Sequence, residues 1–240
     1  MVILLETFLL LQIALFCGNQ IFIFKKLFMK RLILVAVLPF FFIACGPKIY
    51  KSDEFSSVAS THKIVAILPA VVSIQLRPNQ AKKITAEDIK NSEQSTGYAV
   101  QEKMYGWFLR RDQKKNYTVK FQDVSETNSK LKKVNISYDD LRTASKKELA
   151  DLLGVDAVIS TNINMEKPMS EGAAVTIGLL VGAWGATNRA NITINIHEHN
   201  KGDLMWKYDY QASGSVFNST DQLVNALMRN ATRKFPYNAQ

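Results

Sequence analysis

One stretch near the amino terminus constrains this chain more than any other, because it has the anatomy of an export signal. Residues 29–31, Met-Lys-Arg, form a short basic start, and residues 32–43 follow as a twelve-residue apolar stretch. A small residue, Ala44, then precedes Cys45. A basic start, an apolar centre and a small residue at the cleavage point are the parts of a secretory signal peptide. The pattern therefore predicts that residues 1–44 are a signal region and that the folded part follows it.

Cys45 extends this prediction. The stretch 42–45, Phe-Ile-Ala-Cys, resembles the lipobox of bacterial lipoproteins, in which the cysteine receives lipid before the signal is removed; Phe42 stands where that box usually has Leu. The resemblance implies that Cys45 is the attachment site for lipid, palmitate among its acyl chains. The alternative is a transmembrane anchor with a chance cysteine, but twelve apolar residues are too few because a spanning helix needs about 20.

The segments on either side of this signal carry two further expectations. Residues 1–28 are apolar but lack a basic start. They are either a first membrane segment or the product of a mis-called start, and we favour the second because Met29 opens a complete signal unaided. Residues 45–61 contain Pro, Lys, Asp and several serines. That composition predicts a tether between the lipidated cysteine and the domain.

Charge and cysteine content exclude several classes of function. From Cys45 onward the chain has 26 Lys and Arg against 20 Asp and Glu, an excess of six, with no run of five like charges. We therefore expect no nucleic-acid partner. The two cysteines are Cys17 and Cys45. A disulfide framework and a thiolate zinc site are thus both excluded for the folded part.

The residues after the tether alternate between strand-like and helix-like patterns. The strand-like runs are 63–69, 71–76, 117–124, 155–163, 191–198 and 204–210. The helix-like runs are 85–115, 145–154 and 221–235. Runs 191–198 and 204–210 flank a turn at 200–203 and form the clearest hairpin. The order predicts one α/β domain over residues 62–240, a single mixed β-sheet with packed helices.

Each expected helix has its own signature. The first carries apolar residues at helical spacing; they are Val100, Met104, Trp107 and Phe108. The second has the capping-box spacing from Ser145 to Glu148 and ends at Gly154. The third has an apolar stripe made of Leu223, Val224, Leu227, Met228 and Ala231. Gly97 is a weak point in the first helix.

Three local patterns carry a family resemblance. They are residues 63–69, Lys-Ile-Val-Ala-Ile-Leu-Pro, residues 153–159, Leu-Gly-Val-Asp-Ala-Val-Ile, and the hairpin followed by the closing helix. With the lipobox, they resemble the periplasmic lipoproteins grouped around the curli-secretion protein CsgG, the penicillin-binding-protein activator lipoprotein and the TolB amino-terminal domain. The resemblance implies a domain that binds other proteins or itself, with no enzyme activity. The membrane-spanning hairpins of the curli pore do not align onto this chain.

The sequence offers no constellation of catalytic residues. His197-Glu198-His199 places two imidazoles on one side of a strand, which a metal could use, but we interpret it as a polar face at the end of the hairpin. Asp139-Asp140 point apart and indicate a solvated loop or helix start. No Gly-x-Ser-x-Gly elbow and no phosphate-binding glycine loop occurs. We expect no catalytic residue, no metal and no cofactor.

Residues 172–185, GAAVTIGLLVGAWG, are unusual because they carry no charge and four glycines. They are either a buried core segment or a contact surface for a second subunit or for membrane. We favour the contact surface, because the segment falls between two strands where a short connection is normal. Its candidate interface residues are Gly178, Leu179, Leu180, Val181, Gly182 and Trp184.

Together these patterns predict an outer-membrane lipoprotein of the bacterial envelope that faces the periplasm. We expect a non-enzymatic module that binds an envelope protein or assembles with itself as a homo-oligomer. The alternative is a subunit of an outer-membrane export pore, and the third possibility is an envelope hydrolase.

Overall fold

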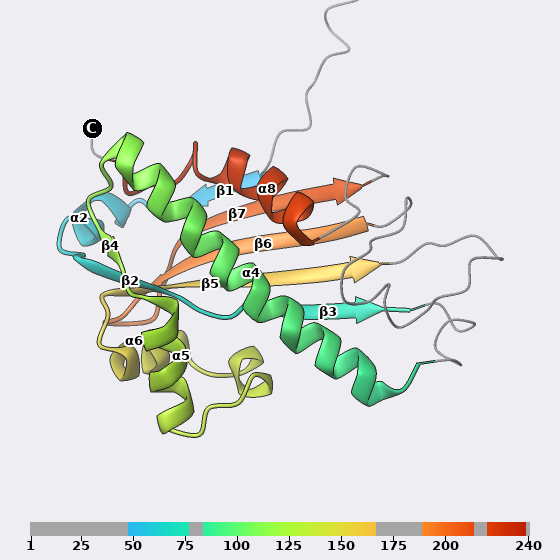
Figure 1. The fold of residues 1–240 in the computed structure, drawn as a ribbon. Coiled ribbons are helices and arrows are strands. Elements are labelled where there is room, and N and C mark those ends of the chain that lie inside the picture. Colours follow the sequence, from blue (N-terminus) through green and yellow to red (C-terminus); the bar gives the residue numbers. More distant parts are fainter. Residues whose placement is uncertain (1–47, 77–83, 167–188, 214–219, 239–240) are drawn as a thin grey trace, which may run out of the picture. The chain divides into compact units, whose positions relative to one another are not determined.

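The computed structural model describes residues 48–76, 84–166, 189–213 and 220–238, and all of them belong to the compact unit that spans Pro47–Gln240. Seven strands form one mixed sheet with helices packed against it (Figure 1). The α/β class expected from the sequence is confirmed. The strands are β1 (Lys48–Lys51), β2 (Ile64–Ile67), β3 (Val71–Gln75), β4 (Lys120–Phe121), β5 (Ala157–Glu166), β6 (Arg189–Glu198) and β7 (Leu204–Ser213). The helices are α2 (Phe55–Ala59), α4 (Ala86–Lys115), α5 (Val124–Lys133), α6 (Lys146–Leu153), α8 (Thr220–Ala231) and the 3-10 helix η2 (Asp139–Arg142).

The sheet has the strand order β1-β7-β6-β5-β2-β4, with β3 also paired to β5. β6 is antiparallel to both of its neighbours, β5 and β7, and β2, β3 and β4 run parallel to theirs. β2 pairs with the start of β5 and β3 with its end, so the chain bends between them, at Pro69 and Ala70, while following one partner strand. The expected hairpin is confirmed as β6 and β7, with a bulge next to His197.

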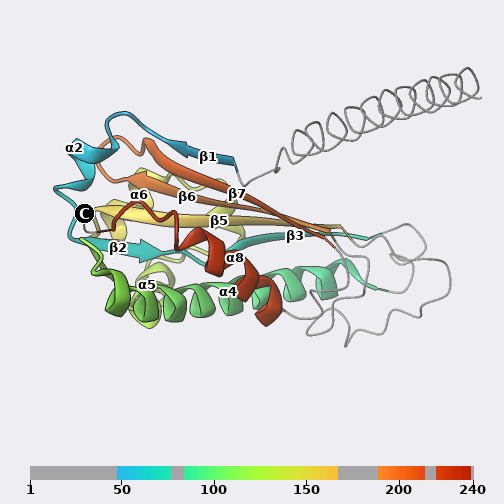
Figure 2. The same ribbon diagram turned by 90° about the horizontal axis from the view of Figure 1, so that it is seen from above.

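Helices α4 and α8 cover one face of the sheet (Figure 2). The alternating apolar residues of β5, β6 and β7 point to this face and form the larger core. Val100, Met104 and Phe108 of α4 are buried there, and Trp107 lies at the edge of the core. The whole predicted stripe of α8 is also buried. The helical faces expected from the sequence are therefore confirmed.

A smaller apolar cluster lies on the opposite face of the sheet. It joins Ala66 of β2, and Leu68 just after this strand, to the leucines of α6 and α5. These are Leu149 and Leu153 of α6 and Leu131 of α5. Helix α6 begins as expected, because the side chain of Ser145 accepts a hydrogen bond from the amide of Glu148. It ends at Gly154, whose φ of 66° is in the left-handed region that glycine tolerates.

Residues 48–61, the described part of the expected tether, belong to the folded domain. β1 pairs antiparallel with β7 from Lys48↔Asp209 to Lys51↔Trp206. Helix α2 follows, and its Phe55 is buried in the main core. The polar composition suggested a flexible linker, but the backbone pairing of β1 and a single apolar anchor are enough to attach this segment to the domain.

The expected strand at 117–124 is also wrong in length. Only Lys120 and Phe121 pair with β2. Asp123 then caps α5 by accepting a hydrogen bond from the amide of Ser125, and the helix begins at Val124. Tyr117 and Val119 are buried and produced the alternating pattern, although they lie in a loop.

Candidate functional site

The second face of the sheet is only partly covered. Helix α6 and its neighbours pack over β2 and the start of β5. Farther along β5 and across β6 and β7, the side chains on this face are polar and reach solvent. They stand in rows across the sheet because the strands are in register. One row pairs Asn162 with Thr193 and Thr193 with Asp209, and the next pairs Asn195 with Lys207.

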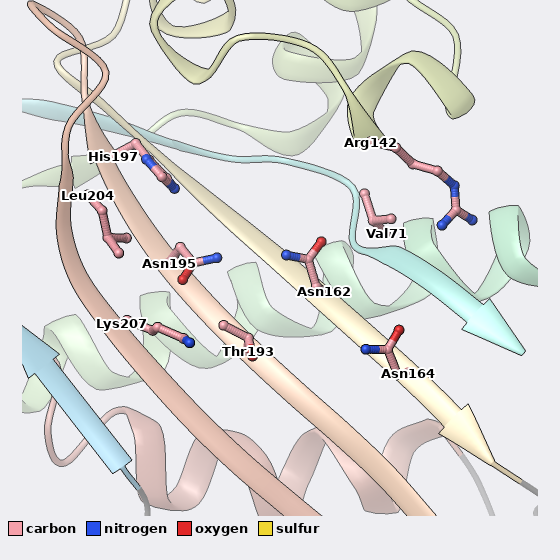
Figure 3. Close-up of a pocket in the computed structure, with 9 residues that line it drawn as sticks. All are labelled: Val71, Arg142, Asn162, Asn164, Thr193, Asn195, His197, Leu204 and Lys207. Carbon is pink, nitrogen blue, oxygen red and sulfur yellow. The ribbon is translucent and has the colours of Figure 1, made fainter.

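A hollow of about 520 Å³ lies on this uncovered face. Figure 3 shows its side chains projecting from the sheet on the side away from α4 and α8. The lining consists mostly of amides, hydroxyls and nitrogen cations. Its members are Val71, Arg142, Asn162, Asn164, Thr193, Asn195, His197, Leu204 and Lys207. We take this open sheet face as the candidate functional site.

Some of the polar groups in the hollow are fixed by neighbours. Thr193 Oγ1 donates to Asp209 Oδ1 at 2.7 Å, and Lys207 Nζ lies 3.3 Å from Asp209 Oδ2. In contrast, the side-chain amides of Asn162 and Asn195 have no hydrogen-bond partner among the residues that the structure describes. An amide carries both donors and an acceptor. These two side chains are therefore available to a polar partner that enters the hollow.

His197 lies at one end of the hollow. Its Nδ1 is 3.2 Å from the carbonyl oxygen of Gly202 in the hairpin turn. Burial lowers the pKa of His197, and the nearby Lys146 lowers it further, against the raising effect of the Gly202 carbonyl. The imidazole is consequently neutral near pH 7 and can offer a hydrogen bond without a charge.

Glu198 does not share the environment of His197. It is buried, and its carboxylate accepts hydrogen bonds from the backbone amides of Asn200 and Lys201, each at 2.6 Å. Burial acts to raise the pKa of Glu198, but the amide hydrogen bonds outweigh burial and hold that pKa below its ordinary value. Glu198 therefore closes the hairpin turn, a role that the sequence did not reveal. Within the described ranges, no three His, Cys, Asp or Glu residues lie close enough to hold a metal ion.

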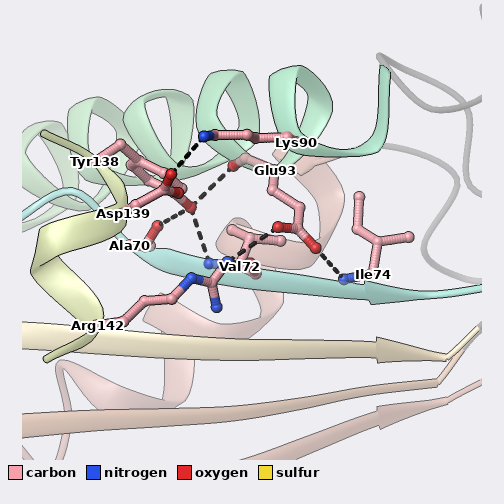
Figure 4. Close-up of polar contacts among 8 residues, drawn as sticks. All are labelled: Ala70, Val72, Ile74, Lys90, Glu93, Tyr138, Asp139 and Arg142. Atoms are coloured by element: carbon pink, nitrogen blue, oxygen red, sulfur yellow. Dashed lines mark hydrogen bonds and ion pairs between the residues drawn. The ribbon is translucent and has the colours of Figure 1, made fainter. Parts of the chain in front are cut away.

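The wall of the hollow is built where η2 meets β3 (Figure 4). Arg142 Nη2 donates to the carbonyl oxygen of Val72 at 2.6 Å and to Glu93 Oε2 at 2.9 Å. The other carboxylate oxygen of Glu93 accepts from the amide of Ile74 at 2.8 Å. Side chains thus occupy the hydrogen-bonding groups on the outer edge of β3, where another strand would otherwise pair.

Tyr138 completes this wall. Its hydroxyl accepts from the amide of Val72 at 2.9 Å and lies 2.8 Å from the carbonyl oxygen of Ala70, to which it donates. Burial raises the pKa of Tyr138 to about 12, so the hydroxyl keeps its proton. Asp139 forms an exposed ion pair with Lys90 at 2.5 Å, and Asp140 accepts from the amide of Ser137 at 2.8 Å. Asp139 thus contacts α4, whereas Asp140 contacts its neighbour Ser137. Both acids lie in the first turn of η2, which confirms their interpretation as a helix start.

The site residues predicted from the sequence are not among those that the structure describes. Cys45 falls in residues 1–47, and the candidate interface residues from Gly178 to Trp184 fall in residues 167–188, which are outside the described part of the chain. None of the helices in the described ranges is both long and apolar enough to cross a membrane. Sequence reasoning missed the hollow, although the polar positions alternating along 160–164 and 191–197 were a usable signal for an uncovered face.

No protein-family model matches the chain, and no curated protein matches it. Among solved structures, it is similar to lipoprotein GNA1162 from Neisseria meningitidis, with 12% identity and a TM-score of 0.38 over 72% of this chain and 96% of that one. It is also similar to the PelC dodecamer from Paraburkholderia phytofirmans, with 8% identity and a TM-score of 0.37 over 81% and 98%. A third is the C-terminal domain of LpoB from Salmonella enterica, with 8% identity and a TM-score of 0.31 over 63% and 83%.

Proposed function

We propose that this protein is a lipoprotein of the bacterial cell envelope whose folded part is a non-enzymatic binding module. Cys45 carries the acyl chains, and the domain faces the periplasm from the outer membrane. The anchoring half of the proposal is supported by the basic start, apolar stretch and Ala44-Cys45 junction of the signal region. The binding half is carried by one observation, the uncovered polar hollow over β5, β6 and β7.

The chemistry of the hollow favours a polar protein segment as the occupant. The side-chain amides of Asn162 and Asn195, which have no partner within the described ranges, lie on neighbouring strands and face the same side of the sheet. Backbone groups of an extended segment present alternating donors and acceptors that such amides can satisfy. The occupant is an envelope protein or a second copy of this chain.

A photocrosslinking experiment in intact cells tests the binding half. A photoreactive amino acid replaces Asn195 in the hollow, and in a matched control it replaces the exposed Lys132 on α5. We expect one discrete crosslinked product from position 195 and none of that mass from position 132. Identical products from both positions, or none from position 195, would refute the binding face.

The anchoring half is tested separately by Cys45→Ser. We expect this variant to take up no labelled fatty acid and to remain unprocessed or soluble, because the acyl acceptor is missing. Undiminished labelling of the variant would contradict the assignment of Cys45. Export and processing of a chain that begins at Met29 tests whether residues 1–28 are needed.

The expected role of residues 172–185 in association remains part of this proposal. The strands on either side of it end and begin at Glu166 and Arg189, which are paired with each other. Replacement of 172–185 by a short Gly-Ser linker should preserve a cooperative melt and reduce the mass in detergent measured by sedimentation. Collapse of the fold would favour the buried-core alternative.

A further inference from the structure

The edge strand β1 has an unusual surface. All four of its residues are exposed, although its backbone pairs with β7. Its centre consists of two large apolar side chains, Ile49 with 43% and Tyr50 with 50% of its surface exposed. Lys48 and Lys51 stand at either end. A strand with apolar residues in the middle and a lysine on each flank matches the boundary between lipid headgroups and water, where aromatic rings and lysine stems are both favourable.

The short stretch of chain between Cys45 and β1 limits how far β1 can lie from the membrane. Only three peptide steps separate Cys45 from Lys48, and three extended residues span about 10 Å at most. This step rests on the proposed function, because it requires lipid on Cys45. With that lipid in a bilayer, Lys48 cannot lie farther than this from the position of Cys45 at the membrane surface.

Pairing with β7 then restricts how the domain meets the membrane. Lys48 is opposite Asp209 and Tyr50 is opposite Lys207, so β1 cannot swing away without breaking the ladder. Lys207 neutralises Asp209 at 3.3 Å. β1 itself carries two lysines and no acid, and the exposed Asp53 and Glu54 follow it in the turn before α2. The positive charge is therefore confined to the strand, where it complements anionic headgroups.

We propose that β1 is a second membrane contact, which lies against the anionic phospholipid surface of the membrane that holds Cys45. Lys48 and Lys51 bind headgroup phosphates, and Ile49 and Tyr50 lie among the headgroups. The sheet is consequently held by its β1 edge, and the polar hollow stands to the side, where a periplasmic partner reaches it.

Depth-dependent quenching on the full-length lipidated protein in vesicles tests this contact. An environment-sensitive fluorescent amino acid replaces Tyr50, and the matched control replaces Leu109, which is 40% exposed on α4. The vesicles contain phosphatidylcholine, phosphatidylglycerol and a phospholipid spin-labelled at its headgroup. We expect quenching at position 50 to be several-fold stronger than at position 109. Equal quenching at the two positions would overturn the proposal.

A charge-reversal pair tests the chemistry of the contact. Lys48→Glu with Lys51→Glu should reduce quenching at position 50, whereas Lys132→Glu with Lys133→Glu on exposed α5 positions should leave it unchanged. Equal effects of both pairs would contradict a specific contact by β1.

Fatty-acid labelling of the same samples separates the two proposals. Labelled protein without a difference between positions 50 and 109 overturns the contact by β1 alone. Absence of label from the wild-type chain overturns the anchoring at Cys45 and the contact together.

Discussion

Replacing either of two glycines of α4 with alanine should change the free energy of unfolding, but in opposite directions. A Cβ at Gly97 would lie 2.3 Å from the carbonyl oxygen of Ala70 and 2.6 Å from Cε2 of Tyr138. Real Cβ contacts are not this short, so α4 and the connection between β2 and β3 must move apart. The movement would strain the hydrogen bond from the amide of Ala70 to the carbonyl oxygen of Gly97, now 3.1 Å. At Gly106 the nearest atom would be Arg110 Nη1 at 3.4 Å, the end of a flexible side chain.

The magnitudes follow from these two environments. Overpacking costs about 1–3 kcal/mol, and a strained buried hydrogen bond adds roughly 1 kcal/mol. Alanine restores about 1 kcal/mol of helix propensity at either position. Gly97→Ala should therefore lower the free energy of unfolding by about 1–3 kcal/mol, and Gly106→Ala should raise it by about 0.5–1 kcal/mol.

Urea denaturation followed by circular dichroism measures both variants under the same conditions. The expected result is a lower midpoint for Gly97→Ala and a higher one for Gly106→Ala, with similar slopes. A Gly97→Ala protein as stable as wild type would show that α4 does not approach Ala70 and Tyr138 as closely as described.

Three further predictions concern the core and its titratable groups. Tyr138→Phe leaves the buried amide of Val72 without its acceptor and should cost about 1–3 kcal/mol in a urea melt; an unchanged midpoint would refute this role. Leu227→Asp places a charge in the main core and should abolish cooperative melting; a melt like that of wild type would contradict the burial of α8. Burial lowers the pKa of His62 below its ordinary 6.5, so the unfolded chain binds the proton more readily. Stability should be full above pH 6.5 and decrease as pH falls below it, and His62→Phe should weaken this dependence measured by thermal melts.

Local patterns were sufficient to predict most of the fold. The spacing of Val100, Met104 and Phe108 predicted the buried face of α4, since helical periodicity is a property of consecutive residues. The Ser145 cap and Gly154 likewise defined both ends of α6 through contacts within a few residues. The β6–β7 hairpin was visible because each strand alternates and a turn separates them.

The errors arose where structure depends on distant partners. β1 shows no alternation between buried and exposed positions, and its pairing with β7 brings together opposite ends of the folded part. Helix α5 was missed because its sequence is mostly polar and its core contact is made chiefly by Leu131. The hollow was missed for a related reason: alternation revealed a polar face, but only the packing of α6 determines which part of that face stays uncovered.

The pairing of β1 with β7 also has a consequence for the order in which the strands of the sheet form. β1 lies near the beginning of the folded part, and its partner strand is the last strand of the sheet. Contacts between such distant segments form late, because a long loop must close first. For a chain that crosses a membrane amino terminus first, as the proposed function requires, Lys48–Lys51 remain unpaired until the β6–β7 hairpin has arrived. Under the proposed function, an acylating enzyme would act on Cys45 before the β1 edge closes.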